Sequence, residues 1–148
     1  MEKDHHHGDL VEGISKQLDR IISNSEQGIY IYLDDKHKMC NSRFSSLLGY
    51  RSPDEWAKVE KSFPEAFVHN DSQKTLIFAY QDAMEKMKAS AISVTWNKRT
   101  GGTVDSSVLL VPMVYQNHMF AIHFVSNEIV KNDLNAEKEY AASMLSGD

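Results

Sequence analysis

The sequence contains a single cysteine, Cys40, among 148 residues. A lone cysteine cannot form a disulfide within the chain, and it excludes zinc centres built from several cysteine ligands. Long hydrophobic runs are also missing. The longest apolar stretch, Val108 to Val114, is broken by Pro112 and is far shorter than the roughly 20 residues of a membrane-spanning helix. Because the first residues are polar and lack the hydrophobic segment of a secretion signal, we expect a cytoplasmic location.

Positive charge is scarce as well. The chain has 16 Lys and Arg residues against 21 Asp and Glu residues, for a net charge of −5. Proteins that follow a phosphate backbone normally carry a concentrated basic surface, so binding to nucleic acid is disfavoured. The apolar content of 41% and the charged content of 25% are those of an ordinary globular protein, and the length suits one domain.

Catalytic sequence patterns are also missing. The chain has no G-x-S-x-G, H-E-x-x-H or P-loop motif, and the pairs Asp34-Asp35 and Asp54-Glu55 are explained by a turn and by helix capping. We therefore predict that the chain is not an enzyme. The alternative is a small enzyme of a similar cone-shaped α+β fold, which would need a buried Asp–His pair, with Asp105 and His123 as the candidates within strands.

Residues 28–50 organise the rest of the chain. Their pattern predicts two short strands, 29–33 and 37–40, around a polar turn. Asn41 stands at the N-cap position of a following helix, because its side chain can accept a hydrogen bond from a free backbone N–H. Gly49 stands where a left-handed residue ends that helix. These elements can bury their apolar side chains only if later elements cover them.

An amphipathic helix is predicted before this stretch, over Asp9–Ser23. Asp9 and Glu12 resemble a capping box at its start. The preceding histidines, His5 to His7, are interpreted as part of a flexible tail rather than as metal ligands, and no metal site is predicted. Residues 1–25 are thus assigned to a tail followed by a helix.

The remaining elements follow from caps and periodicity. Ser52-Pro53 begins a short helix, residues 62–67 form a helical turn, and a long helix covers about Ser72 to Ala89. Three strands joined by short turns follow, from residue 91 to residue 125, and predict an antiparallel meander. A charged helix is expected over 127–148. Because the last strands are apolar on both faces, helices should cover one face, and the first helix or a second subunit the other.

Several motifs mark residues 26–126, namely Gly28-Ile29, Asn41–Tyr50, Ser52–Trp56, Val68–Asp71, Lys98–Gly102 and Ala121–Val125. Together with the element order, these motifs resemble those of a PAS domain. The resemblance implies an α+β fold with a five-stranded antiparallel sheet, short helices and one long helix on one face, and flanking helices at both ends. It also implies a pocket between the sheet and the long helix.

Several aromatic and apolar side chains are candidates to line that pocket, although they could simply fill the core. They are Tyr30, Tyr32, Phe44, Tyr80, Met84, Trp96 and Tyr115. The cofactor is unknown. Flavin of the LOV type is disfavoured because residues 62–67 contain no cysteine. Haem is disfavoured because the long helix contains no histidine, which leaves His37 and His69 as poor substitutes.

These features predict a signal-transduction module that binds a small ligand or a protein partner. We expect it to form a homodimer through its N-terminal helix and the outer face of the sheet, and to signal through its flanking helices. The alternative is a sensor loaded with haem or flavin.

Overall fold

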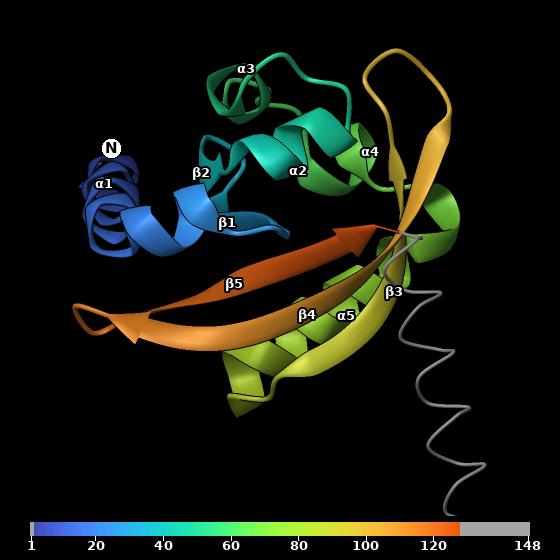
Figure 1. The fold of residues 1–148 in the computed structure, drawn as a ribbon. Helices are drawn as coiled ribbons and strands as arrows, with labels where there is room; N and C mark the ends of the chain where they lie inside the picture. Colours follow the sequence, from blue (N-terminus) through green and yellow to red (C-terminus); the bar gives the residue numbers. More distant parts are fainter. Residues whose placement is uncertain (1, 128–148) are drawn as a thin grey trace, which may run out of the picture.

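The computed structural model describes residues 2–127, with side chains from residue 7 onward, as one antiparallel sheet between two helical layers (Figure 1). The strand order is β2-β1-β5-β4-β3, so the first and last strands in the chain pair at the middle of the sheet. The strands are β1 Gly28–Asp34, β2 His37–Cys40, β3 Ser90–Asn97, β4 Thr103–Tyr115 and β5 His118–Asn127. The helices are α1 Glu2–Asn24, α2 Ser42–Leu47, α3 Pro53–Ala57, α4 Phe63–Phe67 and α5 Asn70–Lys86.

The first helix is longer than the sequence predicts. It begins at Glu2 rather than Asp9, so Asp9 lies inside the helix and is not its cap. The predicted flexible tail is therefore wrong for His7, which is helical and buried. The sequence pattern misses this start because residues 2–9 contain no apolar side chain. Contacts of His7 with the β1–β2 hairpin hold it instead.

The structure confirms the prediction that Asn41 caps α2, and the Asn41 side chain makes further hydrogen bonds. Its side-chain oxygen accepts hydrogen bonds from the N–H groups of Phe44 and Ile29, both at 3.0 Å. Its amide nitrogen donates to the carbonyls of Ile22, at 2.9 Å, and Gln27, at 3.0 Å. All four hydrogen-bonding positions of the buried amide are thus satisfied. One side chain joins the end of α1, the linker, β1 and α2.

Two glycines make the path around α2 possible. A Cβ atom on Gly28 would lie 3.2 Å from the Cα atom of Phe44, so a larger residue there would push β1 and the helix apart by a few tenths of an ångström. Gly49 has a φ of 84° and follows α2, as its sequence position predicts. Beyond it, Ser52 caps α3 by accepting from the N–H of Glu55 at 3.1 Å.

A buried lysine joins β2 to the α3 segment. The ammonium group of Lys38 donates to the carbonyls of Asp35 at 2.6 Å, Ala57 at 3.1 Å and Val59 at 2.5 Å. Its side chain is only 4% exposed, and its nitrogen also lies 5.4 Å from the centre of the Trp56 ring. A buried charge of this kind needs such partners, and they fix the α3 segment against the sheet.

The later elements match the expected order with shifted ends. The long helix α5 begins two residues before the predicted Ser72 and ends before Met87, which has a φ of 52°. Strand β5 continues through Asn127, where the C-terminal helix was expected to begin. The rest of that predicted helix, 128–148, lies outside the described residues.

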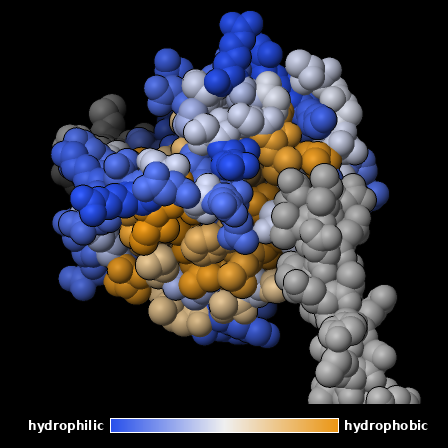
Figure 2. Space-filling view, in the orientation of Figure 1, coloured by the Kyte–Doolittle hydropathy of each residue, from blue (hydrophilic) through white to orange (hydrophobic). Residues whose placement is uncertain are grey.

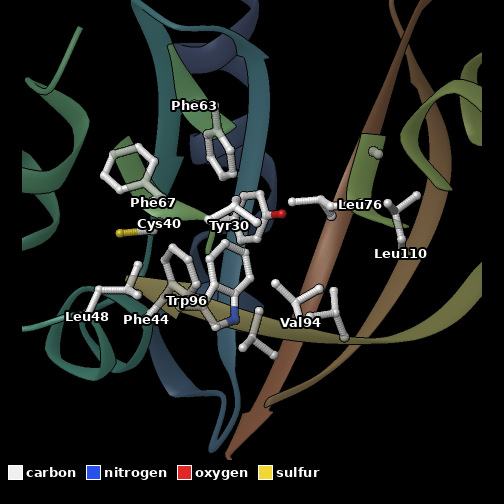
Figure 3. Close-up of a cluster of buried hydrophobic side chains, with 14 of the residues drawn as sticks. Tyr30, Cys40, Phe44, Leu48, Phe63, Phe67, Leu76, Val94, Trp96 and Leu110 are labelled. Atoms are coloured by element: carbon white, nitrogen blue, oxygen red, sulfur yellow. The ribbon is translucent and has the colours of Figure 1, made fainter. Parts of the chain in front are cut away.

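Two separate hydrophobic clusters lie on the two faces of the sheet. The inner cluster, between the sheet and α2 to α5, is rich in aromatic side chains (Figure 3). The outer cluster lies under α1 and is mostly aliphatic. Thus α1 of the same chain contributes to the cover of the outer face, which the sequence had left open between this helix and a second subunit. The buried members of the outer cluster are Leu10, Ile14, Ile22, Ile29, Ile31, Phe120 and Ile122.

Candidate ligand pocket

Tyr30 occupies the centre of the inner face. It lies on β1 opposite His123 of β5, and the two rings stack at 3.9 Å with an angle of 10° between their planes. The rings of Phe44, at 4.8 Å, and Phe63, at 5.3 Å, are also stacked with Tyr30. Trp96 approaches edge-on at 5.8 Å. Residues from β5, α2, α4 and β3 therefore hold this one ring in place.

A cavity of about 280 Å³ lies beside Tyr30, between the sheet and α4 and α5. Its volume corresponds to roughly nine water molecules at about 30 Å³ each. The exposed positions of Ile77 and Gln81 on α5 place its mouth at this helix. This size and chiefly apolar lining suit a small organic molecule. The lining residues are Tyr30, Tyr32, Phe63, Pro64, Leu76, Ile77, Tyr80, Gln81 and His123.

Tyr30, a residue of the cavity wall, carries a polar hydroxyl group. It is buried and has no hydrogen-bond partner within the described part of the chain. Figure 3 shows its oxygen on the side that faces Leu76 of α5, which also lines the cavity. Burial raises the pKa of Tyr30 well above its ordinary value, so the hydroxyl remains protonated. It can therefore donate a hydrogen bond to a bound molecule.

The other tyrosine hydroxyl from β1 is already engaged. Tyr32 donates to a carboxylate oxygen of Asp35 at 2.9 Å, and that same oxygen accepts the N–H of Phe63 at 3.0 Å. The ring of Tyr32 meets those of Phe63 and Tyr80 edge-on. This network fixes the end of the cavity that is nearest the β1–β2 turn.

His123 contributes a neutral imidazole to the wall. It is 2% exposed, and burial lowers its pKa from 6.5 to about 3. Its Nδ1 atom lies 3.4 Å from the backbone carbonyl oxygen of Tyr30, where Nδ1–H can only donate. The ring is thus uncharged at neutral pH. Asp105, its predicted partner in an enzyme, is exposed and accepts from the Thr95 hydroxyl at 2.6 Å, so the two do not form an Asp–His pair.

The structure brings together only part of the predicted set. Tyr30, Tyr32 and Tyr80 line the cavity. Phe44 and Trp96 are fully buried behind Tyr30, and Met84 packs against the inner cluster without lining the cavity. Tyr115 is a correction, because it lies on the outer face beside Gly13 of α1. Strand β4 alternates its faces, and Tyr115 shares the outer face with Leu109 and Met113.

Sequence reasoning missed several wall residues, notably His123, Phe63 and Leu76. An imidazole in an apolar strand was a usable signal for His123, but its neighbour Tyr30 is 93 residues away. Phe63 and Leu76 look like ordinary core residues in a sequence. Their place at the wall depends on how α4 and α5 lie on the sheet.

The residues weighed for cofactors lie away from this cavity. Cys40 is buried at the end of β2, where burial raises its pKa to about 12, so it is a thiol and not a thiolate. His69 caps α5 and accepts from the N–H of Asp71. His37 lies at the β1–β2 turn, close to Asp34 and His7. None of the three lines the cavity.

A larger open hollow of about 660 Å³ lies at the joint between α1 and β1. Most of its lining side chains are polar, and it reaches Ser126, next to the end of the described residues. Its walls lack a buried unpartnered polar group such as the Tyr30 hydroxyl. The cavity beside Tyr30 is therefore the better candidate for a ligand site.

Comparison with known proteins identifies the architecture. A PAS domain from a two-component sensor histidine kinase superposes with a TM-score of 0.58, covering 79% of this chain and 98% of that one at 12% identity. The chain has the PAS fold. The PAS domain of an HTR-like protein from Haloarcula marismortui gives a TM-score of 0.54 over 83% of this chain and 98% of its own, at 19% identity. A sensory box histidine kinase/response regulator from Burkholderia thailandensis gives 0.57 over 88% and 98%, at 11% identity.

Sequence comparison adds nothing to this likeness. No protein-family model matches the chain, and no curated protein matches it significantly. At these identities the likeness establishes the PAS fold, with its five-stranded antiparallel sheet, and not an activity. Within residues 2–127, no helix has the length and apolar character needed to cross a bilayer.

Proposed function

We propose that this PAS-fold chain is a sensor module that binds a small, largely apolar molecule beside Tyr30 and catalyses no reaction. The observation that supports it is the buried hydroxyl of Tyr30, a residue of the cavity wall, which has no hydrogen-bond partner among the described residues. Leaving a buried polar group unpaired costs about 1–3 kcal/mol, and a ligand acceptor group would recover part of that cost. The ligand should therefore combine an apolar ring with one hydrogen-bonding group.

Two simple probes test the role of the hydroxyl. Phenol and toluene have similar shapes, but only phenol carries an oxygen that can pair with Tyr30. Titrations followed by NMR should show that the wild-type protein binds phenol about two- to tenfold more tightly than toluene, which is the value of one net hydrogen bond. Tyr30→Phe should lose this preference and keep toluene binding. An unchanged preference for phenol in the variant would contradict the proposal.

A variant that blocks the entrance of the cavity tests the position of the ligand site. Ile77 lines the cavity and is 40% exposed, so Ile77→Trp can fill the entrance without entering the core. We expect it to weaken the binding of both probes at least tenfold. The matched control is Phe78→Trp on the same helix, since Phe78 is 63% exposed and does not line the cavity. Equal binding by both variants would place the site elsewhere.

Self-association is the second part of the proposal. Helix α1 leaves part of the outer face uncovered, where Leu109 is 46% exposed beside the half-buried Phe124. Figure 2 shows hydrophobic residues gathered over β4 and β5 next to α1. Contiguous apolar surface of this kind favours an interface, and we propose that a second copy of the chain covers it together with α1.

Sedimentation equilibrium at micromolar concentration tests this dimer. Leu109→Glu should give monomers, because it would bury an unpaired charge, whereas Val114→Glu, a change at an exposed residue on the other face of β4, should leave the dimer intact. A wild-type monomer would overturn the proposed dimer and leave the ligand site standing. The flanking helices would carry the signal, and a cytoplasmic location stays a prediction.

A haem- or flavin-loaded sensor is the alternative reading of the same fold. An absorption spectrum of the purified protein separates the two, because both cofactors absorb at wavelengths beyond the aromatic side chains. A mass spectrum under native conditions would then identify any smaller molecule that accompanies the protein.

A further inference from the structure

Three titratable side chains meet where the first turns of α1 cross the β1–β2 hairpin. The Nδ1 atom of His7 lies 2.5 Å from one carboxylate oxygen of Asp34. The Nδ1 atom of His37 lies 2.8 Å and 3.0 Å from the two oxygens of the same carboxylate. One ligand atom from each residue falls within 4.8 Å of the other two. Two imidazoles from distant segments therefore converge on one carboxylate.

A third imidazole lies next to this group. His118 begins β5, and the centre of its ring is 5.1 Å from that of His7. The His7 and His37 ring centres are 6.1 Å apart. Gly8 of α1 lies against the His37 ring, since a Cβ atom there would be in ordinary van der Waals contact with it at 3.7 Å. The His7 side chain is just 9% exposed, so the cluster is sheltered on the side of the helix.

Imidazole nitrogens and a carboxylate oxygen are the usual ligands of Zn²⁺, whereas Mg²⁺ and Ca²⁺ prefer oxygen ligands alone. In a tetrahedral zinc site with bonds of about 2.0 Å, neighbouring ligand atoms lie roughly 3.3 Å apart. The hydrogen-bonded N–O separations seen here, from 2.5 to 3.0 Å, are shorter by about 0.3 to 0.8 Å. Small outward movements of these side chains would admit the ion, which would replace the shared protons.

We propose that His7, Asp34 and His37 form a zinc-binding site, with the His118 ring next to His7. This site is separate from the cavity beside Tyr30 and does not depend on the proposed ligand. Its consequence is mechanical, because the ion would join α1 directly to the hairpin. Zinc would then stabilise the docked position of α1 on the outer face, adding to the apolar contacts of Leu10 and Ile14.

Calorimetric titration of the full chain with zinc chloride tests the site. Both His37→Gln and Asp34→Asn should weaken zinc binding at least about tenfold, since even indirect partners of metal ligands cost 10- to 100-fold when mutated. Asp34→Asn keeps an oxygen that can accept the N–H groups of Lys36 and His37, so the turn should survive. The matched control, His69→Gln, removes a histidine outside the cluster and should bind like the wild type.

The His37→Gln and Asp34→Asn variants retain His5 and His6, so they distinguish zinc binding at the cluster from zinc binding by adjacent histidines. Equal affinity in the wild type, His37→Gln and Asp34→Asn would mean that adjacent histidines alone hold the metal, and would overturn the proposal. An absence of zinc binding by the wild type would overturn it too. In that case the cluster is only a hydrogen-bonded clasp.

A second measurement does not depend on the variants folding well. Cobalt(II) added to the wild-type chain should give the absorption of a tetrahedral ion, because coordination geometry is diagnostic. A spectrum of six-coordinate, hydrated cobalt would contradict the site. Zinc should also raise the thermal midpoint of the wild type in proportion to its occupancy, and should slow hydrogen exchange in α1.

Discussion

The two faces of the sheet carry hydrophobic clusters of different chemistry. The inner cluster contains Tyr30, Phe44, Trp56, Phe63, Phe67 and Trp96, and its rings meet in stacked and edge-on pairs. The outer cluster has one fully buried aromatic residue, Phe120, among isoleucines and a leucine. Both unpartnered buried polar atoms of the described chain, Tyr30 Oη and Trp56 Nε1, belong to the inner cluster.

The aromatic cluster accompanies the cavity beside Tyr30 on the inner face. Aromatic rings are large and rigid, and they settle in a few preferred arrangements, so a set of them can leave space that no side chain fills. Aliphatic side chains adapt more closely to a helix that lies across them. The inner face therefore combines a rigid wall with a cavity, whereas the outer face holds a helix in place.

The largest expected effect is the loss of a ring from the inner wall. Phe44 is fully buried and contacts the rings of Tyr30, Trp56 and Trp96. Phe44→Ala should lower the free energy of unfolding by about 3–5 kcal/mol, because its neighbours are too rigid to close the gap. Urea denaturation measures this. The exposed Phe78→Ala should change it by less than about 0.5 kcal/mol, and a similar loss in both variants would contradict the comparison.

A smaller loss is expected from the outer cluster. Ile14 is 1% exposed under α1, and Ile14→Ala should cost about 2–4 kcal/mol, since the helix can shift to fill part of the space. Hydrogen exchange should show the loss of protection concentrated in α1. The control is Ile21→Ala on the same helix, where the side chain is 56% exposed. If hydrogen exchange in Ile14→Ala instead accelerated throughout the sheet, the inner and outer clusters would not be energetically independent.

The smallest expected effect is the pH dependence that His123, on the inner face, gives to the free energy of unfolding. His123 takes up a proton near pH 6.5 in the unfolded chain but only near pH 3 when folded, because burial lowers its pKa. The unfolded state therefore binds more protons between these values, and stability falls as the pH falls. Between pH 7.5 and 4.5 this loss is at most about 2.7 kcal/mol, at 1.36 kcal/mol per unit.

The variant His123→Phe isolates this contribution. Phenylalanine keeps the stacking on Tyr30, and the adjoining cavity gives it room. Urea titrations at pH 7.5 and 4.5 should show a smaller loss for the variant than for the wild type. Parallel losses would mean that His123 is not buried in its neutral form.

Much of the fold was predictable because its signals are local. The caps Asn41 and Ser52 and the terminal Gly49 act on neighbouring residues, and their sequence spacing carries that information. The candidate site was less predictable. Tyr30, Tyr32 and Tyr80 were anticipated, yet Tyr115 was placed on the wrong face. Strand periodicity divides residues into two sets but does not say which set a given helix covers.

By itself, the sequence determined the order of the elements, the caps of α2 and α3, and the antiparallel meander. Tertiary structure alone decided how far α1 extends and which residues meet. His7 lies 27 residues from Asp34, and Tyr30 lies 93 residues from His123. Such pairs leave no local pattern, because strand pairing and the position of a helix on a sheet depend on the summed packing of the whole chain. The cavity and the histidine cluster both arise from that packing.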